Sequence, residues 1–361
     1  MTLKKRVLRV STFVCMALIV FSLMSCSSGD TQVITLRIGS AHSLANPWVA
    51  SMDNFFVPEI SRRVAERTDY QIEWIRAYGA SVARLGDELE AIEMGLLDVG
   101  TTIIIFEPAR LMLHTMMFRM PFAASCPIVV NRVAQQLYRE FPEHAAIFKQ
   151  YNQKLLTMGV CDPYGLFSRV PIESLSDVSG LRIGAGGANL HWINGSGAVP
   201  VNVSLNEVFQ AVQTNVIQGT IQPTTSCFNL RVHEVAPYFL EANFAVMPFN
   251  SITINLDTWN SLPPEVQEIF IEVGREQEDV QARDMVEAYE RALEQMRAEG
   301  VTITSLSREE QIKWAYSLPD IVFEMVSELN SRGYRGTEIA RRYFELLEEN
   351  GWPKVRNWRL E

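Results

Sequence analysis

GLRIGAGGANLHWINGSGAVPVNVSLNEVFQAVQTNVIQGTIQP, residues 180–223, contains the pattern that decides the fold. Three short apolar runs in it predict strands, at 181–184, 199–203 and 219–222. A glycine-rich turn leads into a short helix at 187–195. Ser204 and Glu207 have the spacing of a capping box that opens a helix ending near residue 215. Strands alternating with helices predict a mainly parallel sheet covered by helices, so this stretch forms one α/β lobe.

The chain before this stretch repeats the pattern without repeating the sequence. Apolar runs predict strands at 35–40, 70–76 and 99–105. Amphipathic stretches predict helices between them, at about 48–67 and 82–94. Further helices are expected at 131–140 and 143–151, and further strands at 155–160 and 165–169. The simplest architecture is therefore two α/β lobes.

A long helix follows both lobes. After an apolar strand at 244–254, a helical pattern begins at Pro263-Pro264 and continues to about Glu299. Such a helix is about 50 Å long at ~1.5 Å per residue, which suits an element that bridges two lobes. A second capping box, Ser307 to Glu310, opens the C-terminal helices. We divide the chain into lobe I (35–160 plus 247–285), lobe II (161–246 plus 286–345) and a C-terminal extension (346–361).

The N-terminus is typical of an exported protein. Lys4, Lys5, Arg6 and Arg9 precede an apolar run over 10–24, which is shorter than the roughly 20 residues that span a bilayer. The run ends Leu-Met-Ser before Cys26, as in a bacterial lipoprotein signal. We predict cleavage of 1–25, a lipid on Cys26, a tether over 26–34 and a periplasmic location at a membrane surface. A plain periplasmic product and an uncleaved anchor remain alternatives.

Composition and charge exclude several classes of protein. The net charge of −10 over 361 residues argues against a nucleic-acid binder. Three cysteines remain beyond Cys26, namely Cys126, Cys161 and Cys227. They allow either a Cys126–Cys161 disulfide or three buried thiols. No spacing suggests zinc, and neither a nucleophile elbow nor a phosphate-binding loop is complete, so we expect no metal, no cofactor and no enzyme.

Several short motifs resemble the solute-binding proteins of TRAP transporters (DctP type), a family of tripartite, ATP-independent periplasmic systems. The resemblance runs from about residue 35 to about 351. The matching pieces are 180–183 (GLRI), 197–200 (GAVP), 206–209 (NEVF), 218–223 (QGTIQP), 85–88 (LGDE), 94–99 (MGLLDV), 121–122 (PF) and 262–267 (LPPEVQ).

The resemblance implies a two-lobed binding protein with hinge strands and one long helix shared by both lobes. It also implies closure around a small-molecule ligand and delivery to a small and a large membrane subunit. A ligand-binding lipoprotein that feeds a sensor or an accessory protein remains an alternative, which the sequence does not separate from transport.

The ligand position is where this sequence departs from the family. Most members hold an organic acid with an arginine directly after the GLK-I strand, and here that position is Gly184. Without this cation, a buried carboxylate would cost several kcal/mol, so a neutral, cationic or largely apolar solute is favoured. Arg169 lies near the family's second basic position. An ordinary organic-acid binder that uses Arg169 is the alternative.

Other positions near the expected cleft carry acidic, aromatic or polar side chains. Glu88 matches an acidic position and could orient a hydroxyl or pair with an amine. Aromatic side chains would supply apolar area, and amides, hydroxyls and imidazoles would supply hydrogen bonds. The candidate ligand-binding residues are His42, Asn46, Trp48, Glu88, Thr101, Thr102, Phe106, Phe167, Arg169, Gly184, Asn189, Trp192, Leu205, Gln222, Thr224 and Phe228.

Overall fold

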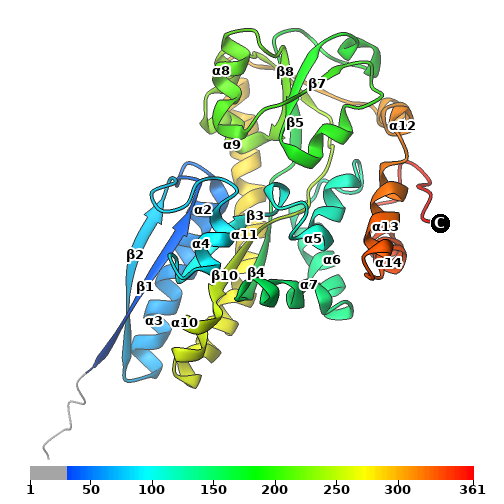
Figure 1. Cartoon of the computed structure of the whole chain (residues 1–361). Helices are drawn as coiled ribbons and strands as arrows, with labels where there is room; N and C mark the ends of the chain where they lie inside the picture. Colours follow the sequence, from blue (N-terminus) through cyan, green and yellow to red (C-terminus); the bar gives the residue numbers. More distant parts are fainter. Residues whose placement is uncertain (1–30) are drawn as a thin grey trace, which may run out of the picture.

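The computed structural model describes residues 31–361 and consists of two α/β lobes (Figure 1). The predicted signal segment and Cys26 lie outside the described residues. The lobe I sheet has the order β2-β1-β3-β10-β4, and the lobe II sheet has the order β11-β9-β5-β8-β6-β7. The two-lobed α/β architecture predicted from the sequence is therefore confirmed.

The strands of lobe I are mostly parallel. β1 pairs in parallel with β2 and β3, whereas β10 is antiparallel to both of its neighbours, β3 and β4. As a result, β1, β2, β3 and β4 all end at the same edge of the sheet. The strands are β1 (Gln32–Ser40), β2 (Tyr70–Tyr78), β3 (Val99–Ile103), β4 (Gln153–Val160) and β10 (Pro248–Asn255).

Lobe II has a similar arrangement. β6, β7 and β8 are parallel, and β5 runs antiparallel to β8 and β9. β6, β7 and β8 therefore end at the edge where β5 begins. The strands are β5 (Tyr164–Ser168), β6 (Arg182–Ala185), β7 (Val199–Asn202), β8 (Gly219–Pro223), β9 (Tyr238–Glu241) and β11 (Thr302–Ser305).

Most predicted helices form, with shifted ends. The segment predicted as one helix over 48–67 is helical throughout, with a π-turn in the middle, but the segment 82–94 is helical only from Glu88. The helices are α2 (Pro47–Ser51), α3 (Val57–Arg67), α4 (Glu88–Glu93), α5 (Met112–Thr115), α6 (Pro127–Glu140), α7 (Glu143–Ala146), α8 (Val208–Gln213), α9 (Thr224–Asn229), α10 (Leu256–Ser261), α11 (Pro264–Ala298), α12 (Arg308–Ser317), α13 (Ile321–Ser331) and α14 (Gly336–Glu349).

Short 3₁₀ segments complete the loops between these elements. The capping box predicted for Ser204 and Glu207 is present and opens one of them, η7, directly before α8. The segments that matter for the site are η2 (Ile104–Phe106), η3 (Met116–Arg119), η6 (Gly187–Trp192) and η7 (Leu205–Glu207).

Helix α11 is the element shared by both lobes. It packs against β4, α6, α2 and α3 of lobe I and reaches α9 of lobe II. Close packing on β4 depends on glycine, because a Cβ on Gly274 would lie 2.6 Å from the Leu156 carbonyl oxygen. Near its far end, the Tyr289 hydroxyl donates to Glu241, the last residue of β9, at 2.9 Å. No helix within residues 31–361 is both long enough and apolar enough to cross a membrane.

Two extended segments cross side by side between the lobes. One, residues 161–163, leads from β4 to β5, and the other, residues 242–247, leads from β9 to β10. The backbone N–H of Cys161 donates to Met247 O at 3.3 Å, and that of Tyr164 donates to Ala245 O at 3.2 Å. These paired crossings form the hinge.

The C-terminal helices return from lobe II to lobe I. α12 packs near η5 (Leu175–Val178) in lobe II, whereas α13 contacts η3 and α14 contacts α6. Arg342 on α14 pairs with Glu140 at 2.8 Å, and Arg335 pairs with Glu143 at 2.9 Å. Residues 321–349 therefore pack on lobe I, although our division placed the chain up to residue 345 in lobe II.

Cys126, Cys161 and Cys227 are free thiols. The thiol of Cys161 lies 3.4 Å from the sulfur of Met247 across the hinge, and no Cys126–Cys161 disulfide is formed.

Candidate functional site

The carboxyl ends of the strands of the two lobes face each other. In open α/β sheets this is the edge where ligands bind, because loops and helix ends gather there. Several close approaches join the lobes across it. Asn229 Nδ2 donates to Ala45 O at 2.8 Å, and Trp192 Nε1 donates to Phe118 O at 2.6 Å. A Cβ on Gly187 would lie 3.0 Å from Ile105 O.

We define the interlobe site as the loops and helix starts at these facing edges. In lobe I they are residues 41–48, 86–88 and 104–107. In lobe II they are residues 186–192, 203–205 and 222–229. Gly184 lies two residues before one of these segments. Eleven predicted residues lie within them: His42, Asn46, Trp48, Glu88, Phe106, Asn189, Trp192, Leu205, Gln222, Thr224 and Phe228.

Lobe I brings several buried polar atoms to this site. His42 Nδ1, Asn46 Oδ1 and Trp48 Nε1 have no hydrogen-bond partner among residues 31–361. His42 packs edge-on against Trp48, with ring centroids 5.4 Å apart, and burial lowers the pKa of His42 to about 4. His42 is therefore a neutral imidazole near pH 7. Each such buried polar atom costs about 1–3 kcal/mol unless a ligand or water pairs with it.

Glu88 is the acidic group of the site. It begins α4 and is 1% exposed. Its Oε2 accepts from the Gly86 N–H at 2.7 Å, whereas its Oε1 has no partner in the described residues. Burial, with smaller contributions from the nearby carboxylates of Glu107 and Asp87, raises the pKa of Glu88 to about 7. No ion pair of residues 31–361 involves Glu88, so its charge is not compensated by a protein cation.

The two threonines of β3 face opposite sides of their sheet. Thr101 Oγ1 donates to Ser40 Oγ at 2.9 Å. Thr102 Oγ1 has no partner, and it lies beside Ser251 on β10, whose hydroxyl has none either. The Thr102 hydroxyl is therefore more available than that of Thr101 for a hydrogen bond to a ligand.

In lobe II, Asn189 is the polar group available for a ligand. It lies on η6, is 1% exposed, and both its amide oxygen and its amide nitrogen lack a partner among the described residues. An amide in this state can accept up to two hydrogen bonds and donate two.

Other predicted polar residues in lobe II are already engaged by the protein. Gln222 Nε2 donates to Val203 O at 3.2 Å, and Thr224 Oγ1 donates to Pro163 O at 2.7 Å. Trp192 donates to Phe118, as above, and stacks on Phe244 at 5.9 Å. These side chains fix the walls of the site and the contact between the lobes.

The apolar candidates differ in whether they reach the facing edges of the lobes. Trp48 packs on Phe249 at 4.7 Å in the floor of lobe I. The half-buried Phe106 approaches lobe II, because a Cβ on Gly186 would lie 3.9 Å from its ring. Phe228 stacks on His233 at 4.7 Å, and Leu205 is buried on η7. Phe167 packs on Phe239 at 4.7 Å inside lobe II and does not reach the facing edge.

Arg169 is not in the interlobe site. β5 begins at the facing edge with Tyr164, so Arg169, which follows the end of β5, lies at the opposite end of the lobe II sheet. Its side chain is exposed and donates to Val212 O at 3.5 Å. Arg182 also lies at that far end, where its guanidinium donates to the carbonyls of Val216 and Asn215 at 2.7 Å each.

Gly184 is tightly packed where the family's arginine would begin. A Cβ built on Gly184 would lie 2.7 Å from Ile217 Cδ1 and 3.5 Å from Val203 Cβ. A longer side chain at this position would have to displace Ile217. The other two neighbours, at 3.5 Å, are at ordinary contact distance, so Ile217 is the side chain that limits the space at this position.

The structure adds site residues that sequence reasoning missed. Asp162 in the hinge accepts from the Thr225 N–H at 2.7 Å through Oδ2, while its Oδ1 has no partner among the described residues. Burial raises the pKa of Asp162 to about 6. The hydroxyls of Thr225 and Ser226 on α9 are buried and unpartnered as well. Their signal was a polar run, 224–226, directly after a predicted buried strand.

A protein-family model, "Bacterial extracellular solute-binding protein, family 7" (DctP), matches residues 51–328. The chain belongs to this family. Its members are solute-binding receptors rather than enzymes. The described residues contain no group of three His, Cys, Asp or Glu side chains that could hold a metal ion.

Individual relatives are distant. The C4-dicarboxylate-binding periplasmic protein DctP of Rhodobacter capsulatus is 29% identical over 41% of this chain and 44% of its own length. A monocarboxylate 2-oxoacid-binding periplasmic protein of Nostoc is 26% identical over 69% of each chain. The chain thus spans less than half the length of the Rhodobacter relative that it matches.

Solved structures show the same fold. A TRAP periplasmic solute-binding protein from Desulfovibrio salexigens, in an open complex, has a TM-score of 0.76 and 21% identity, over 88% of this chain and 96% of that one. One from Rhodoferax ferrireducens, in complex with copurified benzoate, also has a TM-score of 0.76, with 17% identity over 88% and 98% of the two chains.

Proposed function

We propose that this protein is the extracytoplasmic receptor of a TRAP-type transporter and that it captures a small organic solute without an arginine clamp. In this proposal the ligand is neutral, cationic or largely apolar. The observation that supports it is a glycine at position 184, where a Cβ would already approach Ile217 Cδ1 to 2.7 Å, together with the placement of Arg169 and Arg182 at the far end of lobe II.

The polar atoms of the interlobe site, and of β3 and the hinge beside it, support this ligand class. His42 is a neutral imidazole, and Asn46, Thr102 and Asn189 are neutral groups, while the charged members, Glu88 and Asp162, are acidic. A ligand carboxylate would face these acids in a low-dielectric site, where like charges repel strongly. A hydroxyl or a protonated amine on the ligand would instead donate to Glu88 Oε1.

The names of the relatives suggest the alternative ligand class, an organic acid. The relatives named above bind a C4-dicarboxylate, a monocarboxylate 2-oxoacid or benzoate, all organic acids. If this chain also binds an acid, it must use neutral donors such as Trp48 Nε1 and Asn189 Nδ2 in place of a guanidinium.

Native mass spectrometry of the purified mature protein tests the proposal. We expect a copurified neutral or cationic solute, and a thermal-shift screen should show Tm increases with such solutes, since a ligand that binds only the folded state stabilises it by mass action. Strong shifts with simple dicarboxylates, and none with neutral or cationic solutes, would contradict the ligand class while leaving the family assignment intact.

Delivery and anchoring complete the proposal. The receptor would pass its ligand to a small and a large membrane subunit while held at the membrane by a lipid on Cys26. Palmitate labelling that is lost in Cys26→Ala would support the anchor. Copurification with the two membrane subunits separates transport from a role in feeding a sensor or an accessory protein.

A further inference from the structure

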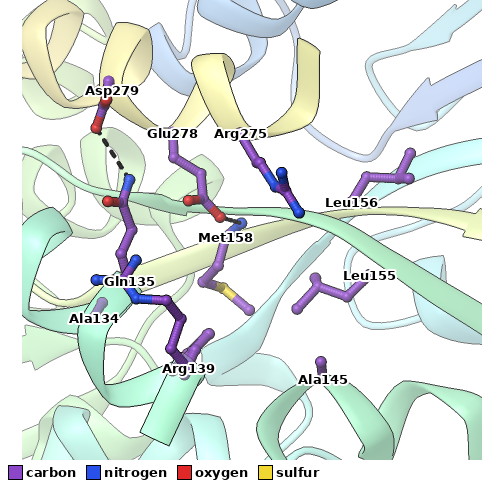
Figure 2. A pocket seen from close by; sticks show the side chains of 11 residues that line it. Ala134, Gln135, Arg139, Ala145, Leu155, Leu156, Met158, Arg275, Glu278 and Asp279 are labelled. Carbon is purple, nitrogen blue, oxygen red and sulfur yellow. Dashed lines mark hydrogen bonds between the residues drawn. The ribbon is translucent and has the colours of Figure 1, made fainter. Parts of the chain in front are cut away.

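A half-open groove between α6 and α11 lies on the outer side of lobe I, away from the interlobe site. Its larger part has a volume of about 640 Å³ and is floored by β4 and flanked by α7 (Figure 2). A smaller part of about 330 Å³ continues it, and both parts are lined by Gln135 and Asp279. We call the two together the α6–α11 groove.

Four arginines line this groove, two from each helix. Arg139 and Arg275 line the larger part, and Arg132 and Arg283 line the smaller part. Figure 2 shows Arg139 extending from α6 and Arg275 from α11 into the larger part from opposite walls. Each part of the groove thus contains one guanidinium from each helix.

The helical spacing places these arginines on one face. Arg132 and Arg139 are seven residues apart, and Arg275 and Arg283 are eight apart, so each pair lies about two turns apart on the same side of its helix. At ~1.5 Å per residue, Arg139 and Arg275 in the larger part lie roughly 10–12 Å along the groove from Arg132 and Arg283 in the smaller part.

None of the four guanidiniums forms an ion pair within residues 31–361. The ion pairs found in residues 31–361 involve other cations, such as Arg63, Arg76 and Arg342, and none involves these four. Arg132 contacts only the Asn350 amide oxygen, at 3.5 Å. In a chain with a net charge of −10, four exposed arginines without carboxylate partners in one groove are an unusual concentration of positive charge.

The two acidic side chains of the groove, Asp279 and Glu278, already accept hydrogen bonds from other groups of the protein. Asp279 Oδ1 accepts from Asn131 Nδ2 at 2.8 Å and from Gln135 Nε2 at 3.0 Å, so it bridges α6 and α11 between the two parts. Glu278 Oε1 accepts from the Met158 N–H of the edge strand β4 at 3.1 Å. Burial raises the pKa of Glu278 to about 7, which reduces its negative charge at neutral pH.

We propose that the α6–α11 groove binds an acidic peptide segment of a protein partner. Guanidiniums pair bidentately with carboxylates, and two arginine pairs suit two acidic side chains. In an extended peptide, residues three or four apart are separated by about 10–13 Å, which matches the spacing of the pairs. Leu155, Leu156 and Ala145 add an apolar floor that a peptide would cover. The proposal is independent of the solute bound between the lobes.

Fluorescence anisotropy with a labelled probe tests this proposal on the full mature chain. The probe is a twelve-residue Gly/Ser peptide with glutamates four residues apart. We expect saturable binding that weakens as NaCl is raised, because the contacts are charged and exposed. In Arg139→Gln/Arg275→Gln and in Arg132→Gln/Arg283→Gln, affinity should fall about tenfold, the equivalent of one lost charge-assisted contact.

The control removes the same net charge elsewhere. Arg62→Gln/Arg291→Gln changes two exposed arginines outside the groove and should leave probe affinity within twofold. Thermal melts confirm that each variant is folded. Absence of probe binding to the wild-type chain, or equal losses in the control, would overturn the proposal. So would tighter binding to inorganic phosphate or phosphatidylglycerol vesicles than to the peptide, since the occupant would then be a phosphate group.

Discussion

Replacing Glu88 by glutamine should make the ligand-free protein more stable at alkaline pH. The Glu88 carboxylate is 1% exposed and has no cation partner, and burial raises its pKa from 4.5 to about 7. At about 1.4 kcal/mol per pH unit, this shift means that the ionised form destabilises the fold by about 3 kcal/mol. A glutamine oxygen can still accept from the Gly86 N–H.

The pH dependence gives this prediction its sign. Below pH 4.5, Glu88 is protonated in both the folded and the unfolded chain, so its charge contributes nothing. As pH rises from 4.5 to about 7, the unfolded chain loses the proton while the folded chain keeps it, and stability falls. Above pH 7 Glu88 is ionised in both states, and the free energy of unfolding has fallen by the full amount. The stability of Glu88→Gln relative to wild type should therefore increase by about 3 kcal/mol from pH 4.5 to 8.

Urea unfolding at several pH values measures this difference. The protein must first be freed of copurified solute by unfolding and refolding, because bound ligand would add its own stabilisation. Buried histidines such as His114 and His144 also make stability depend on pH, but they are present in both proteins and cancel in the difference. Glu90→Gln, an exposed position on the same helix, is the control and should stay within about 0.5 kcal/mol at every pH. A difference between Glu88→Gln and wild type that does not change with pH would refute the reasoning.

Three further predictions concern packing, closure and specificity. Gly274→Ala should lower the unfolding free energy by about 1–3 kcal/mol in urea titrations despite the helix preference for alanine, because the new Cβ would lie 2.6 Å from the Leu156 carbonyl oxygen. The control is Glu294→Ala, an exposed position on the same helix. Asn229→Ala removes the hydrogen bond to Ala45, worth about 0.5–1.5 kcal/mol, and should weaken solute binding about two- to tenfold by calorimetry; an unchanged affinity would mean that this contact does not stabilise closure. Arg169→Gln should leave solute affinity unchanged, and a tenfold loss would restore the arginine-clamp alternative.

Local signals predicted much of the fold. The alternation of residues 35–40 predicted β1, and the Ser204–Glu207 capping box correctly marked η7 and α8. The length and apolar spacing of residues 263–299 predicted α11 to within one residue at each end. These features depend on neighbours within a few residues, so the sequence alone contains the information.

Elements that depend on distant partners were missed. α9 has a polar, β-branched sequence, and the N–H of its second residue, Thr225, is satisfied by Asp162 from the hinge. β9 and β11 are four residues each and form by pairing with one another and with β5. Similarly, the position of Arg169 follows from the antiparallel direction of β5, which only the pairing with β8 and β9 determines.

Ligand recognition and lobe closure are one event in this geometry. With Ala45 against Asn229 and Phe118 against Trp192, the polar atoms of His42, Asn46, Trp48, Glu88 and Asn189 are buried without partners, and each costs about 1–3 kcal/mol. Without ligand, this cost opposes the closed form. A solute that pairs with them removes the cost only in the closed form, and this differential affinity drives closure. In the proposed receptor, the chemistry of these unpaired atoms therefore sets both which solute is bound and whether the lobes stay together.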